Sequence, residues 1–213
     1  MNCCTPLYDA VFDAKRAAKE IKAYRKSGLS KQSLPLLQML HYLPLTDATL
    51  LDVGGGFGGM SFELLKKGMR EATLVDISDH YVQAYLNLAE EKGFRDQVRA
   101  VQGDLAAIKD QVPSSDLVIM DKVICCYANY QELILATCEK AKHYLAYSLP
   151  ADLWWVRVAL KVSQKWRQLR GVNFDTFVHS TDAVEMLVLA NGFRKVKEVR
   201  RREWLYVLFE RSD

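Results

Sequence analysis

The sequence predicts an α/β fold with a Rossmann-like, doubly wound, mostly parallel seven-stranded sheet that ends in a C-terminal antiparallel hairpin. From residue 49 onward, short runs rich in Val, Leu and Ile alternate with longer helical stretches, which is the pattern of parallel βαβ units. A glycine cluster directly follows the first run, where open α/β sheets bind their ligands. Two further runs without a helix between them close the chain and indicate the hairpin.

The segment 1–48 is expected to form a helical lid or cap. Apolar residues recur on one helical face over residues 7–26, lysines occupy the other face, and Gly28 ends the helix. A second helix is expected over residues 33–43, before Pro44. A helical segment ahead of a ligand-binding domain is placed to close over the ligand.

Residues 49–213 are expected to form the main domain. Its predicted strands cover residues 49–53, 72–76, 98–102, 117–121 and 144–148, with the hairpin at 195–199 and 204–209. Its predicted helices cover about residues 60–67, 80–92, 130–140 and 181–191, and a helical insertion lies at about 151–180.

Composition narrows the classes of function. The chain has 213 residues, of which 50% are hydrophobic and 26% charged, as in a globular enzyme. A net charge of +3 is too small for a phosphate-binding face, so no nucleic-acid partner is expected. No apolar run is long enough to span a membrane, and the first residues lack the apolar stretch of a signal peptide. A cytoplasmic protein is therefore expected.

The five cysteines occur as Cys3-Cys4, Cys125-Cys126 and the single Cys138. An odd number in a chain without an export signal favours reduced thiols over disulfides. The spacing is not that of a zinc site, and no histidine lies close in sequence, so no metal is expected. The alternative, a soft metal or metalloid held by an adjacent pair, stays open.

The strongest motif runs from Leu50 to Gly59 as LLDVGGGFGG. Glycines at positions 54, 56 and 58 permit a tight turn between strand and helix and remove the Cβ atoms that would block a ligand. Asp52 precedes the first glycine, which suits a ligand with an ammonium group and a sulfonium better than a pyrophosphate.

Two more acids follow the next strands. Asp76 ends the second strand, where a carboxylate can accept from both hydroxyls of a ribose. Asp104 follows the third strand, where it can accept from an adenine amino group. Each acid alone could equally be a turn or cap residue. Three of them beside a glycine loop predict a binding crevice for a nucleoside ligand.

The motifs LDVGGGFGG, LVDIS, QGDL and DLVIMDKV resemble those of class I S-adenosylmethionine-dependent methyltransferases. The resemblance implies that Asp52 lies near the methionine moiety, that Asp76 holds the ribose and that Asp104 holds the adenine. It implies S-adenosyl-L-homocysteine as the product. The cofactor-binding residues expected from these motifs are Asp52, Gly54, Gly56, Gly58, Asp76, Ile77, Asp104, Leu105 and Asp121.

The motifs DKVICCY, YSLP with Trp154-Trp155, and FVH resemble the group of magnesium-protoporphyrin IX methyltransferases. The resemblance implies a small-molecule acceptor, with methylation of a carboxylate on a hydrophobic, anionic, tetrapyrrole-like molecule as the first hypothesis. Methyl transfer to a phenol, amine, thiol or metalloid is the second. A non-catalytic, cofactor-binding regulatory protein is the third.

His179 and Tyr127 are the candidate catalytic residues. His179 is the best candidate for a base or an orienting group, and Tyr127 follows the fourth strand, where it could orient an acceptor. The predicted helix 152–170 carries an apolar stripe with two tryptophans and a row of cations. This helix could roof an anionic acceptor, lie on a membrane surface, or pack its stripe into the core. The sequence leaves the oligomeric state open.

Overall fold

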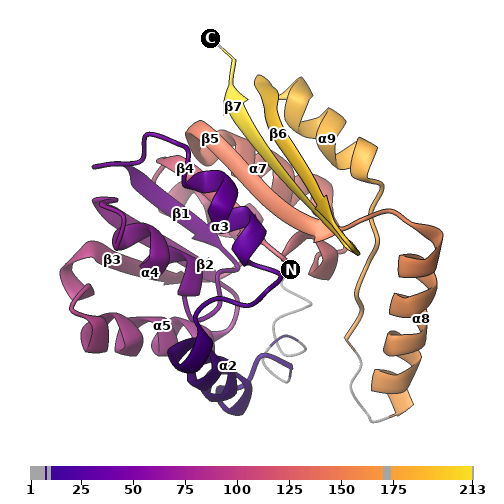
Figure 1. The fold of residues 1–213 in the computed structure, drawn as a ribbon, viewed down its shortest axis with the longest axis horizontal. Helices are drawn as coiled ribbons and strands as arrows, with labels where there is room; N and C mark the ends of the chain where they lie inside the picture. The colour runs from indigo at the N-terminus through magenta and orange to yellow at the C-terminus, as the bar shows by residue number, and fades with distance from the viewer. Residues whose placement is uncertain (1–7, 9–10, 170–173, 213) are drawn as a thin grey trace.

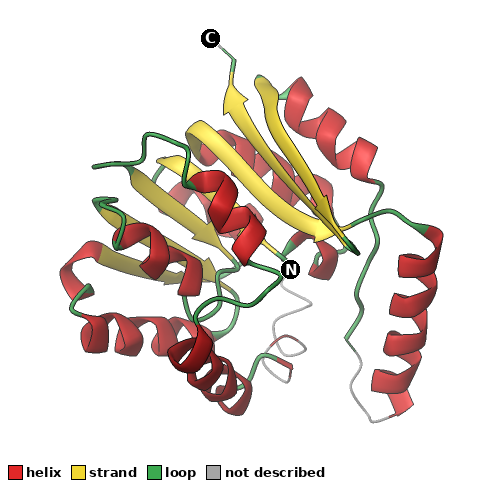
Figure 2. Ribbon diagram, viewed as in Figure 1, coloured by secondary structure: helices red, strands yellow, loops and turns green. Residues whose placement is uncertain are grey.

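A computed structural model describes residues 8, 11–169 and 174–212 and confirms the predicted fold class. Seven strands form one sheet in the order β3-β2-β1-β4-β5-β7-β6, with helices on both faces (Figures 1 and 2). The first five strands are parallel, and β7 runs antiparallel to both β5 and β6. Their bounds are β1 Thr49–Val53, β2 Glu71–Asp76, β3 Val98–Gln102, β4 Ser115–Asp121, β5 Ala141–Pro150, β6 Phe193–Arg201 and β7 Trp204–Arg211.

Two apolar clusters, one on each face of the sheet, form the core. On one face, α3 (Leu34–Leu40), α4 (Gly59–Leu65) and α5 (Asp79–Lys92) cover the strands. On the other face lie α6 (Leu105–Ile108), α7 (Tyr130–Lys140) and α9 (Thr181–Ala190). Leu36 and Leu40 of α3 are fully buried, so this part of the predicted cap belongs to the domain core.

The first described helix, α2 (Ala14–Ser27), starts later than the predicted helix 7–26. Asp13 has an extended backbone and its side chain accepts from the Arg16 amide, which caps the helix there. Gly28 adopts a positive φ of 72° and ends the helix, as predicted. The predicted helical residues 7, 9 and 10 lie outside the described residues, as do Cys3 and Cys4.

The helix α8 (Trp154–Leu169) stands apart from the sheet and its covering helices (Figure 1). Val156 is its only buried residue among those described, while Trp154 is 78% exposed and Val162 54% exposed. The apolar stripe therefore does not pack into the core. That alternative for the predicted helix 152–170 is wrong, because the face of α8 turned toward the protein is a different one.

The strand β6 forms one edge of the sheet. Its sequence FRKVKEVRR places most side chains in solvent, and its pairing with β7 shifts register between Lys195 and Lys197. At the other end of the sheet, β3 pairs only with β2. No helix in the described part of the chain is long and apolar enough to cross a membrane.

Candidate active site

A cavity of about 410 Å³ opens where the parallel strands β1, β2 and β4 end. Its floor is the glycine loop, and its walls come from three directions. One wall is the loop after β4, a second is the N-terminal segment with α2, and a third is the segment around α8 and its following loop. The predicted crevice at the carboxyl ends of the strands is therefore present.

The glycine loop needs its glycines for two different reasons. Gly54 and Gly56 line the cavity with φ values of 61° and 60°, a conformation that side chains rarely adopt. Gly58 has a φ of 76° but lies behind the cavity, where a Cβ atom would come within 2.1 Å of the Tyr85 ring. Gly58 therefore serves the close packing of the glycine loop against α5, and the structure does not place it among the residues that could contact a ligand.

Asp52 lies almost completely buried at the base of the cavity, with 1% of its surface exposed. Its Oδ2 accepts from Ser61 Oγ at 2.7 Å, whereas its Oδ1 is buried without any hydrogen-bond partner among the described residues. Burial raises the pKa of Asp52 to about 7, and the nearby Asp121 and Asp76 act in the same direction. A buried acceptor without a donor indicates that a ligand supplies one.

Asp76 is held by the backbone around it. Its Oδ2 accepts from the Gly56 amide at 3.0 Å and its Oδ1 from the Ser78 amide at 2.9 Å. Burial raises the pKa of Asp76 to about 6, although both amides oppose the shift. Each carboxylate oxygen can accept a further bond, so this fixed acid, with Ile77 beside it on the cavity wall, could hold a diol.

Asp104 and Leu105 do not line the cavity. Asp104 caps α6 by accepting from the Ala106 amide at 3.0 Å, and its other oxygen accepts from the Tyr127 hydroxyl. Leu105 is buried in the apolar cluster on the face of the sheet that α6, α7 and α9 cover. In this structure Tyr127, which does line the cavity, separates Asp104 from it. The Tyr127 hydroxyl thus contacts Asp104 on the expected adenine side, and the role of Tyr127 in orienting an acceptor stays a prediction.

Asp121 lies on the cavity wall at the end of β4 and is held by two serines. Its Oδ1 accepts from Ser148 Oγ and its Oδ2 from Ser33 Oγ, both at 2.6 Å. Lys122 follows with a positive φ of 64°, and its Nζ donates to Ser33 Oγ at 2.9 Å. The Lys122 Nζ also lies 3.5 Å from Asp121 Oδ2, so this cation on the cavity wall pairs with the acid.

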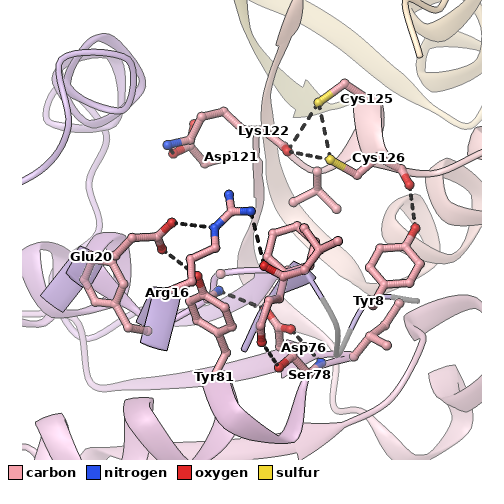
Figure 3. A pocket seen from close by; sticks show the side chains of 18 of the residues that line it. Tyr8, Arg16, Glu20, Asp76, Ser78, Tyr81, Asp121, Lys122, Cys125 and Cys126 are labelled. Carbon is pink, nitrogen blue, oxygen red and sulfur yellow. Dashed lines mark hydrogen bonds and ion pairs between the residues drawn. The ribbon is translucent and has the colours of Figure 1, made fainter. Parts of the chain in front are cut away.

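The N-terminal segment closes one side of the cavity (Figure 3). The hydroxyl of Tyr8 donates to the Cys126 carbonyl, and the Ser78 hydroxyl donates to the Phe12 carbonyl. Farther along, Glu20 accepts from both Arg16 and the Tyr81 hydroxyl (Figure 3). These contacts join the segment to the loops after β2 and β4, as a cap over a ligand site requires.

The third wall carries a second buried polar atom without a partner. Arg167 of α8 donates from its NH2 group to Thr176 Oγ1 at 2.8 Å, but its Nε is buried and unbonded among the described residues. Phe174 lies beside them and makes edge contacts with the rings of Tyr8 and Phe12, each at 5.4 Å between centroids. Arginine and aromatic rings thus line this mouth of the cavity.

His179 lies outside the cavity, which corrects its prediction as a catalytic base. Its Nε2 lies 3.1 Å from the Ile124 carbonyl and 3.0 Å from the Tyr127 carbonyl, and its ring lies between Tyr130 and Phe177. Burial lowers the pKa of His179, so the neutral ring donates to these carbonyls and fixes the loop after β4. An isolated histidine in the sequence gives no sign of which way its ring faces.

Cys125 and Cys126 both line the cavity, with their sulfurs 3.8 Å apart (Figure 3). The hydrogen bond with Cys125 lowers the pKa of Cys126, and the charges of Arg16 and Arg167 lower it further. The same bond raises the pKa of Cys125. No group of three or more potential metal ligands occurs among the described residues.

Sequence reasoning missed Arg16, Glu20, Ser33, Lys122 and Arg167 as residues of the site. Lys122 stands inside the quoted motif after β4, so its motif position was a usable signal. Arg16 and Arg167 lie on helices that the sequence marks only as basic and amphipathic. Which cation faces the cavity depends on how each helix meets the sheet, and helical periodicity does not encode this.

Residues 50–144, somewhat less than half of the chain, match the family described as a methyltransferase domain. Together with the sheet order and the glycine loop, this match supports a class I S-adenosylmethionine-dependent methyltransferase. No curated protein matches the sequence.

Within that class, the chain is similar to magnesium protoporphyrin IX methyltransferase from Synechocystis PCC 6803, solved with bound S-adenosylhomocysteine. The two share 20% identity over 91% of this chain and 86% of that one, with a TM-score of 0.71. An O-methyltransferase family protein from Burkholderia thailandensis gives 17% identity over 85% of this chain and 56% of that one, with a TM-score of 0.68. An O-methyltransferase family 2 protein from Planctomyces limnophilus, in complex with apigenin, gives 15% identity over 93% and 61%, with a TM-score of 0.67. These likenesses establish the fold.

Proposed function

We propose that this methyltransferase transfers a methyl group to a carboxylate of a hydrophobic anionic small molecule, with a tetrapyrrole as the first candidate. The observation that carries the proposal is a pair of buried polar atoms in one cavity, Asp52 Oδ1 and Arg167 Nε, that have no hydrogen-bond partner in the described part of the chain. They belong to side chains of opposite charge, Asp52 at the base of the cavity and Arg167 on the wall that α8 provides. A cationic group on one ligand and an anionic group on the other would satisfy both.

The acidic wall fits S-adenosylmethionine. Asp52 would accept from its ammonium group, and Asp76 would accept from its ribose hydroxyls, with Gly54 and Gly56 leaving room for close approach. When bound, this cofactor supplies a sulfonium methyl for displacement. Asp104 would take part only if the Tyr127 hydroxyl released it, so the adenine role of Asp104 remains a prediction.

The cationic wall fits an anionic acceptor. Arg167 and Lys122 line the cavity, and a guanidinium binds a carboxylate through two parallel hydrogen bonds. Phe12, Phe174 and Tyr8 supply the apolar part of this wall. These residues would orient the carboxylate and exclude water, and orientation alone lowers the barrier of a displacement substantially.

A carboxylate acceptor also suits the lack of a histidine among the described residues that line the cavity. A carboxylate is ionised near neutral pH and needs no base, whereas a phenol or amine gains from a base with a pKa near 7. The volume of about 410 Å³ lies at the small end of ligand pockets, which suits the carboxylate-bearing edge of a large acceptor rather than its whole body.

The test is a turnover assay for S-adenosylhomocysteine over protoporphyrin IX, its magnesium complex, smaller apolar carboxylates, phenols and thiols. Arg167→Met should raise the KM for the active carboxylate by on the order of 10- to 100-fold, because a charged hydrogen bond is lost. The dissociation constant for S-adenosylhomocysteine should stay unchanged.

Arg157→Met is the matched control, because Arg157 lies on the same helix but pairs with Asp152 in solvent and does not line the cavity. If Arg167→Met and Arg157→Met have the same KM as the parent chain, the anionic subsite is wrong. If only thiols or phenols turn over, the carboxylate assignment is wrong.

A second candidate acceptor is a thiophilic metalloid, favoured by the two cavity sulfurs of Cys125 and Cys126. The lowered pKa of Cys126 supplies the thiolate that such an atom binds. Phenylarsine oxide, which condenses with two thiols and releases water, should then bind the parent chain and lose affinity in Cys126→Ser. Turnover of a trivalent arsenical but not of carboxylates would favour this candidate.

A further inference from the structure

The outer face of α8 is an apolar surface whose side chains are largely exposed. Its members are all exposed: Trp154 78%, Trp155 41%, Val158 52%, Val162 54%, Trp166 59% and Leu169 85%. At about 100° per residue, these positions fall on one stripe roughly a third of the helix circumference wide. We call this set the α8 stripe.

The face of α8 turned toward the protein lies on the opposite side. It consists of the buried Val156 and the half-buried Leu160, Gln164 and Arg167. Gln164 and Arg167 donate to Asp175 and Thr176 in the following loop. The centres of the two faces are about 180° apart on a helix of this geometry. The α8 stripe therefore cannot be covered by a small adjustment of this helix against its own domain.

All charged side chains of α8 are positive. Between Trp154 and Leu169 the helix carries Arg157, Lys161, Lys165 and Arg167 and no carboxylate. Arg157, Lys161 and Lys165 recur every four residues along one border of the α8 stripe, and of these Arg157 pairs with Asp152. Arg167 belongs to the cavity wall instead. Tryptophan and leucine beside a row of exposed cations are the composition of helices that lie in a membrane interface.

We infer that α8 docks the enzyme on an anionic lipid bilayer, with the α8 stripe inserted among the headgroups and acyl chains. A lipid surface fits better than a second copy of the chain. A symmetric contact between two copies would bring the same row of cations together, whereas anionic headgroups complement it. Because Arg167 lies on the opposite face of the same helix, docking would place the cationic mouth of the cavity close to the membrane.

The test measures sedimentation of the full chain with vesicles of phosphatidylcholine plus phosphatidylglycerol and with vesicles of phosphatidylcholine alone. We expect binding to the anionic vesicles, a fall in binding as salt is raised, and a blue shift of tryptophan emission on binding. Lys161→Glu with Lys165→Glu should weaken this binding by about 25-fold or more, since each cation near such a surface adds about fivefold and each new carboxylate is repelled. Trp154→Ser with Val158→Ser should abolish it without lowering Tm, because both side chains are exposed.

Matched controls come from other exposed positions. Lys22→Glu with Lys26→Glu reverses two charges four residues apart on α2, and Tyr42→Ser removes an aromatic ring that is 82% exposed. Both controls should bind vesicles like the parent chain. The inference is overturned if anionic vesicles are not bound, or if the α8 variants bind them normally. It is also overturned if sedimentation velocity shows a dimer that only the α8 variants dissociate, because the stripe would then join two copies. The readout involves no methyl transfer, so the result is separate from the acceptor assignment.

Discussion

Replacing Asp52 by Asn should stabilise the free protein and weaken its cofactor binding. In the free protein, burial holds the pKa of Asp52 at about 7 against a usual value of 3.8. Above pH 7 the unfolded chain and the folded chain both carry the charge, and folding has to bury it. Between pH 4 and 7 the folded state holds a proton that the unfolded state releases, so stability falls across this window as the pH rises.

The rise of the pKa from 3.8 to about 7 corresponds to about 4 kcal/mol of stability lost above pH 7. Asn is nearly the same shape and stays neutral, so it avoids this loss. Its amide group leaves a buried donor without a partner, because only Ser61 bonds the native side chain, and this costs about 1–3 kcal/mol. The net gain for Asp52→Asn at pH 8 is therefore about 1–3 kcal/mol.

Urea denaturation of both proteins at pH 4 and pH 8 measures this difference, and calorimetry with S-adenosylhomocysteine measures affinity. The gain should be present at pH 8 and absent at pH 4, where Asp52 is itself neutral. The dissociation constant should rise on the order of 10- to 100-fold at pH 8, because a buried charged hydrogen bond is lost. An Asn variant that is less stable at both pH values and binds normally would refute this account of Asp52.

Three further outcomes follow from contacts in the structure. Gly58→Ala should lower the free energy of unfolding by about 3 kcal/mol or more in urea denaturation, because the new Cβ overlaps Tyr85. Gly28→Ala, also at positive φ but in open space, should lower it by only about 1 kcal/mol. Equal losses of stability in the two variants would contradict the packing role of Gly58. His179→Ala should lower stability by about 1–3 kcal/mol and leave kcat unchanged, and a large fall in kcat at normal Tm would restore a catalytic role. Iodoacetamide should modify Cys126 well before Cys138, because burial raises the pKa of Cys138 to about 12; peptide mass spectrometry measures both reactions. S-adenosylhomocysteine should slow the reaction of Cys126. Equal labelling of the two thiols would contradict this expectation.

The sheet could be predicted from the sequence because each parallel strand contains a short run of mostly apolar residues. Two of its strands, β1 and β3, and the helix α7 have the predicted bounds. The strands β5 and β6 were predicted too short, because the added residues include polar ones such as Lys142, His143 and Arg201 that an apolar pattern does not mark. Backbone hydrogen bonds to the neighbouring strands, rather than burial of apolar side chains, set the ends of β5 and β6.

The acidic side of the site was predictable because it depends on motif order along consecutive strands. Asp52, Asp76 and Asp121 do meet at one cavity, since parallel strands end at the same edge. Asp104 follows the same rule, yet the Tyr127 hydroxyl covers it, and contacts between distant loops leave no trace in local sequence. Amphipathic periodicity identified the apolar face of α8 but could not tell a face that packs inward from one that remains outside.

The cationic edge strand β6 has a consequence for behaviour at high concentration. An uncovered strand offers free backbone groups to any other extended chain, and this is a common route to aggregation. Here Lys197, Arg200 and Arg201 lie along that edge, and the register shift after Lys195 disturbs its regularity. Two molecules that met edge to edge would bring these charges into direct repulsion. The hairpin can therefore extend the sheet by two strands without making the protein prone to form fibrils through its open side.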